Sequence, residues 1–185
     1  FLNVLLKFVL IYLVPMAAYG EMTKVYIYTT FLTILFTYGM ETAYFRFVQQ
    51  QPDTQELFNT SFTSILVSTL FLSGAMYIWA APIAGAWKVA AHPEWVRWFA
   101  VILGFDTLAA IPFAKLRQQQ RPIKYAFLKF VNIFLQVFFS LYFLVACPWL
   151  ATHHPRNPLL HFYTPGIGVG YVFVANMIAS VITLA

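Results

Sequence analysis

Residues 125–147 read YAFLKFVNIFLQVFFSLYFLVAC, and this stretch decides the fold class of the chain. A helix needs about 20 mostly apolar residues to cross a bilayer, and this stretch is long enough to do so. Helices satisfy their backbone hydrogen bonds internally, whereas an open sheet would leave unpaired groups in hydrocarbon. The polar side chains recur every three or four residues, so they share one face of the predicted helix. They are Tyr125, Lys129, Asn132, Gln136 and Ser140.

The composition of the whole chain agrees with a lipid environment. Hydrophobic residues make up 61% of the chain and charged residues 9%, and the mean hydropathy is +0.73. A soluble domain carries roughly a quarter charged residues, so this chain cannot cover a water-facing surface of ordinary size. The net charge of +5 comes from basic residues at the ends of apolar segments, which indicates membrane topology rather than a nucleic-acid partner.

Five further apolar segments predict an all-α, polytopic membrane protein with six transmembrane helices. Prolines at 15 and 148 are expected to end helices, and Tyr19-Gly20-Glu21 is expected to form a tight turn with Gly20 at positive φ. Both ends of the sequence lie inside apolar runs, so we expect residues 1–185 to be one lobe of a longer protein. The expected helices are 1–14 (truncated), 24–46, 58–83, 94–114, 125–147 and 164–185.

Basic residues between the fourth and fifth segments predict the orientation of the helices. Lys115, Arg117, Arg121 and Lys124 cluster there, whereas the basic residues of the other side are scattered over three loops. Because cytoplasmic loops are enriched in Lys and Arg, this cluster and the amino terminus are expected to be cytoplasmic.

Polar stripes also occur on three other predicted helices. Such faces avoid lipid, so they must meet one another or water; Ser and Thr often serve only to bond helix to helix. The stripes are Tyr26, Thr30, Thr33, Thr37, Glu41 and Tyr44 on the second helix, Ser61, Ser64 and Ser68 on the third, and Asn176, Ser180 and Thr183 on the sixth.

Four charged residues, Lys7, Glu41, Asp106 and Lys129, lie within predicted spans. A charge at the bilayer centre costs at least about 2.5–3.5 kcal/mol, so such residues are usually kept for function. Glu41 and Lys129 lie at similar depth, and we expect them to pair across the bundle. Asp106 precedes Pro112 in mid-helix and is the candidate for a proton- or cation-linked site. The alternative is a structural carboxylate bonded to Gln136 or Asn132.

Other features are interpreted as structural. The segment PGIGVG at 165–170 is expected to permit close helix packing rather than nucleotide binding. Cys147 is expected to be inert packing. No catalytic group, metal or cofactor is predicted. The remaining features are a loop with His153, His154 and His161, and an interfacial aromatic belt of Trp79, Trp87, Trp95 and Trp98.

Three stretches carry a resemblance to a known family: YGE at 19–21, TYGMETAYFRF at 37–47, and AAIPFAKLR at 109–117 followed by Arg121-Pro122. They resemble the oligosaccharide flippases (Wzx type) of the MOP superfamily of multidrug, oligosaccharidyl-lipid and polysaccharide exporters. The resemblance implies a MATE-like transporter of two six-helix lobes, of which this chain is the amino-terminal one. It also implies transport of polyprenyl-pyrophosphate-linked oligosaccharide, such as O-antigen of lipopolysaccharide, capsule or exopolysaccharide repeat units, across the bacterial inner membrane.

The resemblance implies basic cavity residues for the anionic carrier, and Lys7, Arg46 and Lys129 lie on or beside matching segments. We expect these three to bind substrate together with Asn132 and Gln136, while Glu41 and Asp106 provide a charge pair or ion coupling. The expected partners are the lipid-linked oligosaccharide, the phospholipid bilayer and the polysaccharide polymerase machinery. Two alternatives stay open at this point. One is a cation-coupled multidrug antiporter of the same superfamily, and the other is a fragment of a membrane-embedded polysaccharide polymerase or ligase.

Overall fold

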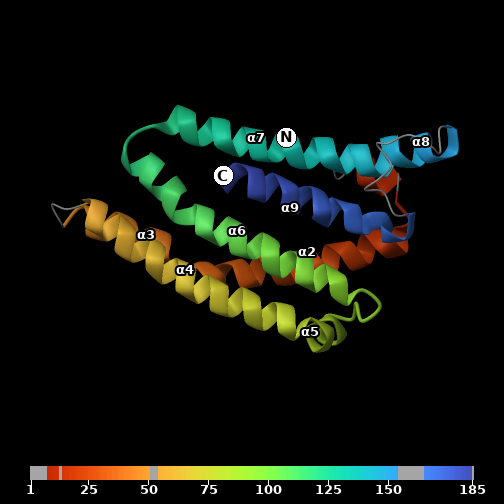
Figure 1. Cartoon of the computed structure of the whole chain (residues 1–185), viewed down its shortest axis with the longest axis horizontal. Coiled ribbons are helices and arrows are strands. Elements are labelled where there is room, and N and C mark those ends of the chain that lie inside the picture. Colours follow the sequence, from red (N-terminus) through yellow and green to blue (C-terminus); the bar gives the residue numbers. More distant parts are fainter. Residues whose placement is uncertain (1–7, 13, 51–53, 154–164, 185) are drawn as a thin grey trace.

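The computed structural model describes residues 8–12, 14–50, 54–153 and 165–184, and these residues form helices and short connections without a strand. A short helical segment, residues 8–12, precedes α2, the first labelled helix (Figure 1). The elements are α2 (Met16–Thr37), α3 (Met40–Val48), α4 (Thr54–Ile78), α5 (Ala80–Ala86), α6 (Pro93–Gln118), α7 (Pro122–Leu141), the π-helical turn η1 (Tyr142–Ala146), α8 (Cys147–His153), the 3₁₀ segment η3 (Pro165–Gly170) and α9 (Tyr171–Leu184).

Three helical stretches are long and apolar enough to cross a membrane, namely Gln55–Ile78, Pro93–Gln118 and Pro122–Ala151. A shorter apolar helix covers Ile167–Thr183. The helix α2 is long, but Glu21, Lys24 and its threonines lower its hydropathy. The expected membrane character is therefore confirmed at these three helices, while the six-span lobe stays a prediction.

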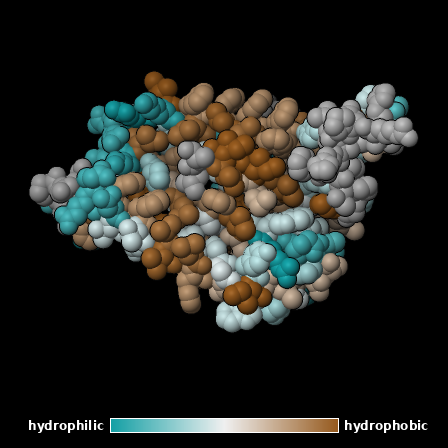
Figure 2. Space-filling model, viewed as in Figure 1, coloured by the Kyte–Doolittle hydropathy of each residue, from teal (hydrophilic) through white to brown (hydrophobic). Residues whose placement is uncertain are grey.

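The long helices form one layer in which α7 packs on α9, α9 on α6, and α6 on α4, with α2 against α6 (Figure 1). Figure 2 shows hydrophobic residues across the middle of the molecule, hydrophilic residues at its left end and a second hydrophilic patch toward the lower right. The left end holds the connection between α6 and α7, where the basic cluster lies. This distribution fits a bundle whose long axis runs across a bilayer.

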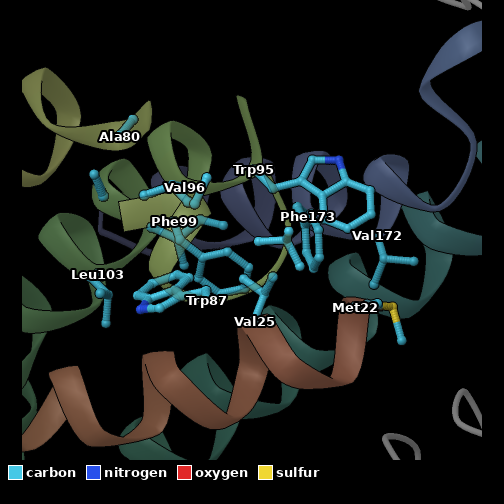
Figure 3. Packing of buried hydrophobic residues seen from close by; sticks show 14 of the residues in the cluster. Met22, Val25, Ala80, Trp87, Trp95, Val96, Phe99, Leu103, Val172 and Phe173 are labelled. Atoms are coloured by element: carbon cyan, nitrogen blue, oxygen red, sulfur yellow. The ribbon is translucent and has the colours of Figure 1, made fainter. Parts of the chain in front are cut away.

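Aromatic side chains from α2, α6 and α9 form the central core (Figure 3). Tyr26 meets the rings of Phe99 and Phe173 with centroid separations of 5.3 and 5.6 Å. Trp95 is 3% exposed within this core and Trp87 is also buried, so two members of the predicted interfacial belt are packing residues instead. The Trp95 ring meets the edge of Phe173 at 5.3 Å, and the Trp87 ring stacks on Tyr28 at 5.1 Å.

The second predicted helix begins earlier and breaks earlier than expected. The predicted turn at residues 19–21 is wrong, because Gly20 lies inside α2 without a positive φ. The break falls at Tyr38 and Gly39, which both adopt the left-handed conformation with φ of 33° and 71°. Gly39 accepts this conformation without steric cost, and α3 starts directly after it.

Several other predicted boundaries shift. The segment 58–83 divides into α4 and α5, and 94–114 extends to Gln118 because Lys115 and Arg117 continue the last turn of α6. Pro148 does not end the fifth helix. The π-helical turn η1 precedes it, and the wider turn accommodates a residue that cannot donate to the helical ladder.

The glycine-rich segment before α9 confirms the prediction of close packing at Gly170. A Cβ atom there would lie 2.8 Å from Cζ3 of Trp98 and 2.9 Å from Cγ2 of Ile167. Gly168 serves differently, since its φ of 52° kinks the chain at the entry to α9.

Candidate functional site

A polar pocket of about 320 Å³ lies between α2, α3, α6, α7 and α9. It extends from the basic end of the bundle to Asp106, near the middle of α6. Arg117 lies about 16 Å further along that helix at roughly 1.5 Å rise per residue. The lining comprises Thr33, Thr37, Glu41, Asp106, Ala109, Ala110, Phe113, Arg117, Tyr125, Lys129, Asn132, Ser180 and Thr183.

Helical spacing places these side chains on facing surfaces. Tyr125, Lys129 and Asn132 recur every three to four residues on α7, and Thr33 and Thr37 do so on α2. Each of these threonines donates a hydrogen bond to the backbone carbonyl four residues earlier, at 2.9 Å for Thr33 and 2.8 Å for Thr37. Their hydroxyl donors are thus satisfied within α2, while the oxygen atoms still offer acceptors to the pocket.

The mouth of the pocket holds an ion pair between Arg117 on α6 and Glu41 on α3. The guanidinium also lies between two aromatic rings, 5.4 Å from the centroid of Phe45 and 5.2 Å from that of Tyr125. Its Nε is buried and has no hydrogen-bond partner among the described residues. The rings hold the guanidinium in place by cation–π attraction, so the group is preorganised to receive a further acceptor.

Asp106 forms the inner end of the pocket. The hydroxyl of Ser180 on α9 donates a hydrogen bond of 2.7 Å to the Asp106 carboxylate. Lys129 lies near enough for its charge to act on this carboxylate, and its ammonium is 4.7 Å from the centroid of the Phe113 ring. The side chain of Asp106 is exposed to the open pocket, so water can reach it from within the bundle.

Amide groups on α7 connect the pocket to its neighbours. Nδ2 of Asn132 donates a hydrogen bond of 3.0 Å to the hydroxyl of Thr183 on α9. Gln136, one turn further along α7, does not line the pocket; its side chain interacts with the hydroxyl of Tyr26 on α2. The expected hydrophilic sides of these helices therefore do meet inside the bundle.

The predicted pair between Glu41 and Lys129 is wrong, because Glu41 pairs with Arg117 instead. The break at Tyr38-Gly39 turns the start of α3 toward the end of α6, and this turn could not be read from an unbroken helix. Asp106 also has a hydrogen-bond partner other than the two that the sequence suggested. The donor is Ser180, not Gln136 or Asn132.

The structure brings four of the predicted site residues to this pocket: Glu41, Asp106, Lys129 and Asn132. Arg46 is exposed on α3 and does not line it. Lys7, like His154 and His161, lies outside the described residues.

Sequence reasoning assigned Arg117 to topology and missed its place in the site. The spacing of Asp106, Ala110, Phe113 and Arg117 repeats every three to four residues, so it could have placed Arg117 on the face of Asp106. Among the described residues, no group of three or more His, Cys, Asp or Glu side chains could hold a metal ion.

The comparisons with known proteins identify the family. Neither curated proteins nor solved structures gave a match. A sequence model of a polysaccharide biosynthesis protein family matches residues 9–149, which is about three quarters of the chain and includes four of the five helices that bound the pocket. This chain belongs to the polysaccharide biosynthesis protein family, of the polysaccharide flippase type.

Proposed function

We propose that this chain is the amino-terminal lobe of a transporter that flips polyprenyl-pyrophosphate-linked oligosaccharide across the bacterial inner membrane, and that the polar pocket binds the ligand. The observation that carries the proposal is the pocket itself. It joins polar faces of five helices around two cations, Arg117 and Lys129, inside a bundle with apolar outer surfaces. The family membership of the chain supplies the class of substrate.

The two cations suit the pyrophosphate group. A guanidinium binds phosphate oxygens through a planar fork of donors, and an ammonium adds a mobile point charge. The Arg117 side chain is 35% exposed at the mouth of the pocket, so part of its guanidinium is accessible to a phosphate oxygen. Two acids, Glu41 and Asp106, balance the two cations of the pocket, which lowers the cost of keeping charges inside the bundle.

Neutral polar groups suit the glycan. Hydroxyl and amide side chains both donate and accept, and sugar hydroxyls require such partners when they leave bulk water. Thr33, Thr37 and Thr183 offer hydroxyl oxygens as acceptors in the pocket, and Asn132 adds an amide group. The pocket therefore offers a wet path for a ligand that hydrocarbon alone would exclude.

Asp106 is the proposed coupling residue. Its carboxylate accepts the hydrogen bond from the Ser180 hydroxyl and is close enough to Lys129 to be affected by its charge. Binding of an anionic ligand to Lys129 would weaken the attraction between Lys129 and Asp106. The carboxylate would then take up a proton or a cation more readily, which links ligand movement to ion movement.

Alternating access completes the proposal. A second lobe would close the open side of the pocket, and rocking of the two lobes would expose it to either side of the membrane. With the basic cluster on the cytoplasmic side, the mouth at Arg117 would face the cytoplasm. Ligand made in the cytoplasm would thus enter where the two cations lie.

Replacing both cations, as in Arg117→Gln with Lys129→Gln, should abolish surface-polysaccharide export while the protein remains in the membrane at normal abundance. The matched control is Lys124→Gln, which removes a basic residue from the same end of the bundle but outside the pocket. Normal export by the double variant would contradict the proposed function.

A further inference from the structure

The ion pair at the mouth of the pocket engages the Arg117 guanidinium, which is also the group expected to bind the pyrophosphate of the proposed ligand. Glu41 presents its carboxylate to the Arg117 guanidinium, and the two side chains are 39% and 35% exposed. A carboxylate and a phosphate oxygen compete for the same donors, so an anionic ligand can bind Arg117 only when the Glu41 carboxylate is displaced.

The position of Glu41 at the start of α3 allows its side chain to move away from Arg117. Glu41 is in the first turn of α3, directly after the left-handed pair Tyr38-Gly39. This break separates α3 from α2, whose last turns contain threonines that bond to their own backbone, a pattern that often bends helices. Met40 and Tyr44 pack α3 against α4 and α6, so release of Arg117 requires only a rotation of the partly exposed Glu41 side chain.

The surroundings of Arg117 explain why such competition would be useful. Arg117 is in the last turn of α6, at the bundle end where hydrophilic residues gather (Figure 2). In a membrane this end lies near phospholipid headgroups, whose phosphodiesters are present in large excess. An unguarded guanidinium there would bind the headgroups of ordinary lipids and would be unavailable to a rare ligand.

We propose that Glu41 is a specificity-determining residue, which acts as an internal competitor that keeps singly charged phosphodiesters off Arg117 and yields to a pyrophosphate. This inference rests on the proposed function and names how the same site selects its ligand. The fold already holds Glu41 beside Arg117, whereas a free phosphodiester must lose its own freedom of motion to bind, so a ligand of equal charge gains little by replacing Glu41. A pyrophosphate brings at least two negative charges and reaches Arg117 and Lys129 together.

The test uses the full protein in dodecyl maltoside micelles, which carry no phosphate, with farnesyl pyrophosphate as the probe and phosphatidylglycerol as the competing phosphodiester. In lipid-free micelles, Glu41→Gln should bind the probe about three- to tenfold more tightly than the wild type, because the carboxylate no longer competes. Added phosphatidylglycerol should weaken probe binding to Glu41→Gln but leave the wild type nearly unchanged.

Glu94→Gln is the matched control. Glu94 also holds a side-chain contact, a hydrogen bond of 2.9 Å with Nδ1 of His92, at similar exposure near the opposite end of α6. Its loss should change neither the affinity for the probe nor the sensitivity to phosphatidylglycerol.

The outcomes separate this inference from the proposed function. If Arg117→Gln loses the probe but Glu41→Gln binds it no more tightly than the wild type, the competitor role is wrong and the anion site stands. Equal inhibition of wild type and Glu41→Gln by phosphatidylglycerol would also overturn it. A wild-type protein that does not bind the probe contradicts the proposed function, and this inference falls with it.

Discussion

Two glycines, Gly20 and Gly39, give the sharpest test of where α2 is continuous and where it breaks before α3. No neighbouring atom lies within 4 Å of a Cβ placed on either one, so an added methyl group meets open space at both positions. They differ in backbone conformation, because Gly20 lies inside α2 whereas Gly39 has a φ of 71°. The substitutions Gly20→Ala and Gly39→Ala should therefore change stability in opposite directions.

The magnitudes follow from the backbone alone. Alanine in a helix interior is favoured over glycine by about 0.5–1 kcal/mol, so Gly20→Ala should stabilise the protein by that amount. An L-residue in the left-handed region costs roughly 1–2 kcal/mol, so Gly39→Ala should destabilise it. The two variants should differ by about 2 kcal/mol in the free energy of unfolding, combining these two costs.

The assay is unfolding in mixed detergent micelles by sodium dodecyl sulfate, followed by circular dichroism, for wild type and both variants. If Gly20→Ala destabilises the protein, residues 19–21 form the turn that the sequence favours, and the helix described there is wrong. A stabilising Gly39→Ala would mean that α2 and α3 form one continuous helix, which would remove the break that turns Glu41 toward Arg117.

Three further substitutions test the packing and the site. Gly170→Ala should destabilise the protein by about 1–3 kcal/mol in the same unfolding assay, because its Cβ would lie 2.8 Å from the ring of Trp98; an unchanged midpoint would contradict this contact. Asp106→Asn should keep the hydrogen bond from Ser180 but abolish ion-coupled export, measured as surface polysaccharide under an imposed proton gradient, and full coupling in this variant would exclude Asp106 as the coupling residue. Arg117→Lys should retain the charge but lose the planar fork, so its affinity for farnesyl pyrophosphate should fall about tenfold, a loss of roughly 1.4 kcal/mol, whereas wild-type affinity would exclude fork recognition.

Helical periodicity was sufficient to predict which sides of the helices meet. The spacing of Thr33, Thr37, Lys129 and Asn132 indicated a shared polar interior, and all four line the pocket. This succeeds because a 3.6-residue repeat fixes side-chain direction along any single unbroken helix. The cost of a charge within a membrane span, rather than periodicity, singled out Asp106, which also lines the pocket.

Breaks in the helices could not be predicted in the same way. Gly20 and Gly39 both suggest a turn in the sequence, and only tertiary packing determines which one adopts a positive φ. The partner of Glu41 depends on that choice, so the sequence favoured Lys129 where the structure has Arg117. Pro148 was misjudged for a related reason, since a π-helical turn before a proline leaves no pattern in hydropathy.

Thiols placed in the pocket should be in contact with water, whereas the exposed phenylalanines of α7, at positions 127, 130, 134 and 138, should contact lipid. Thr33→Cys and Lys129→Cys place thiols in the pocket, whereas Phe134→Cys places one on the outer face of α7, where Phe134 is 51% exposed. The native Cys147 is 1% exposed and should stay silent. In nanodiscs, a charged, membrane-impermeant methanethiosulfonate should label the two pocket cysteines rapidly and Phe134→Cys slowly. Rapid labelling at position 134 with protection at positions 33 and 129 would show that the pocket is not hydrated and that Phe134 does not contact lipid.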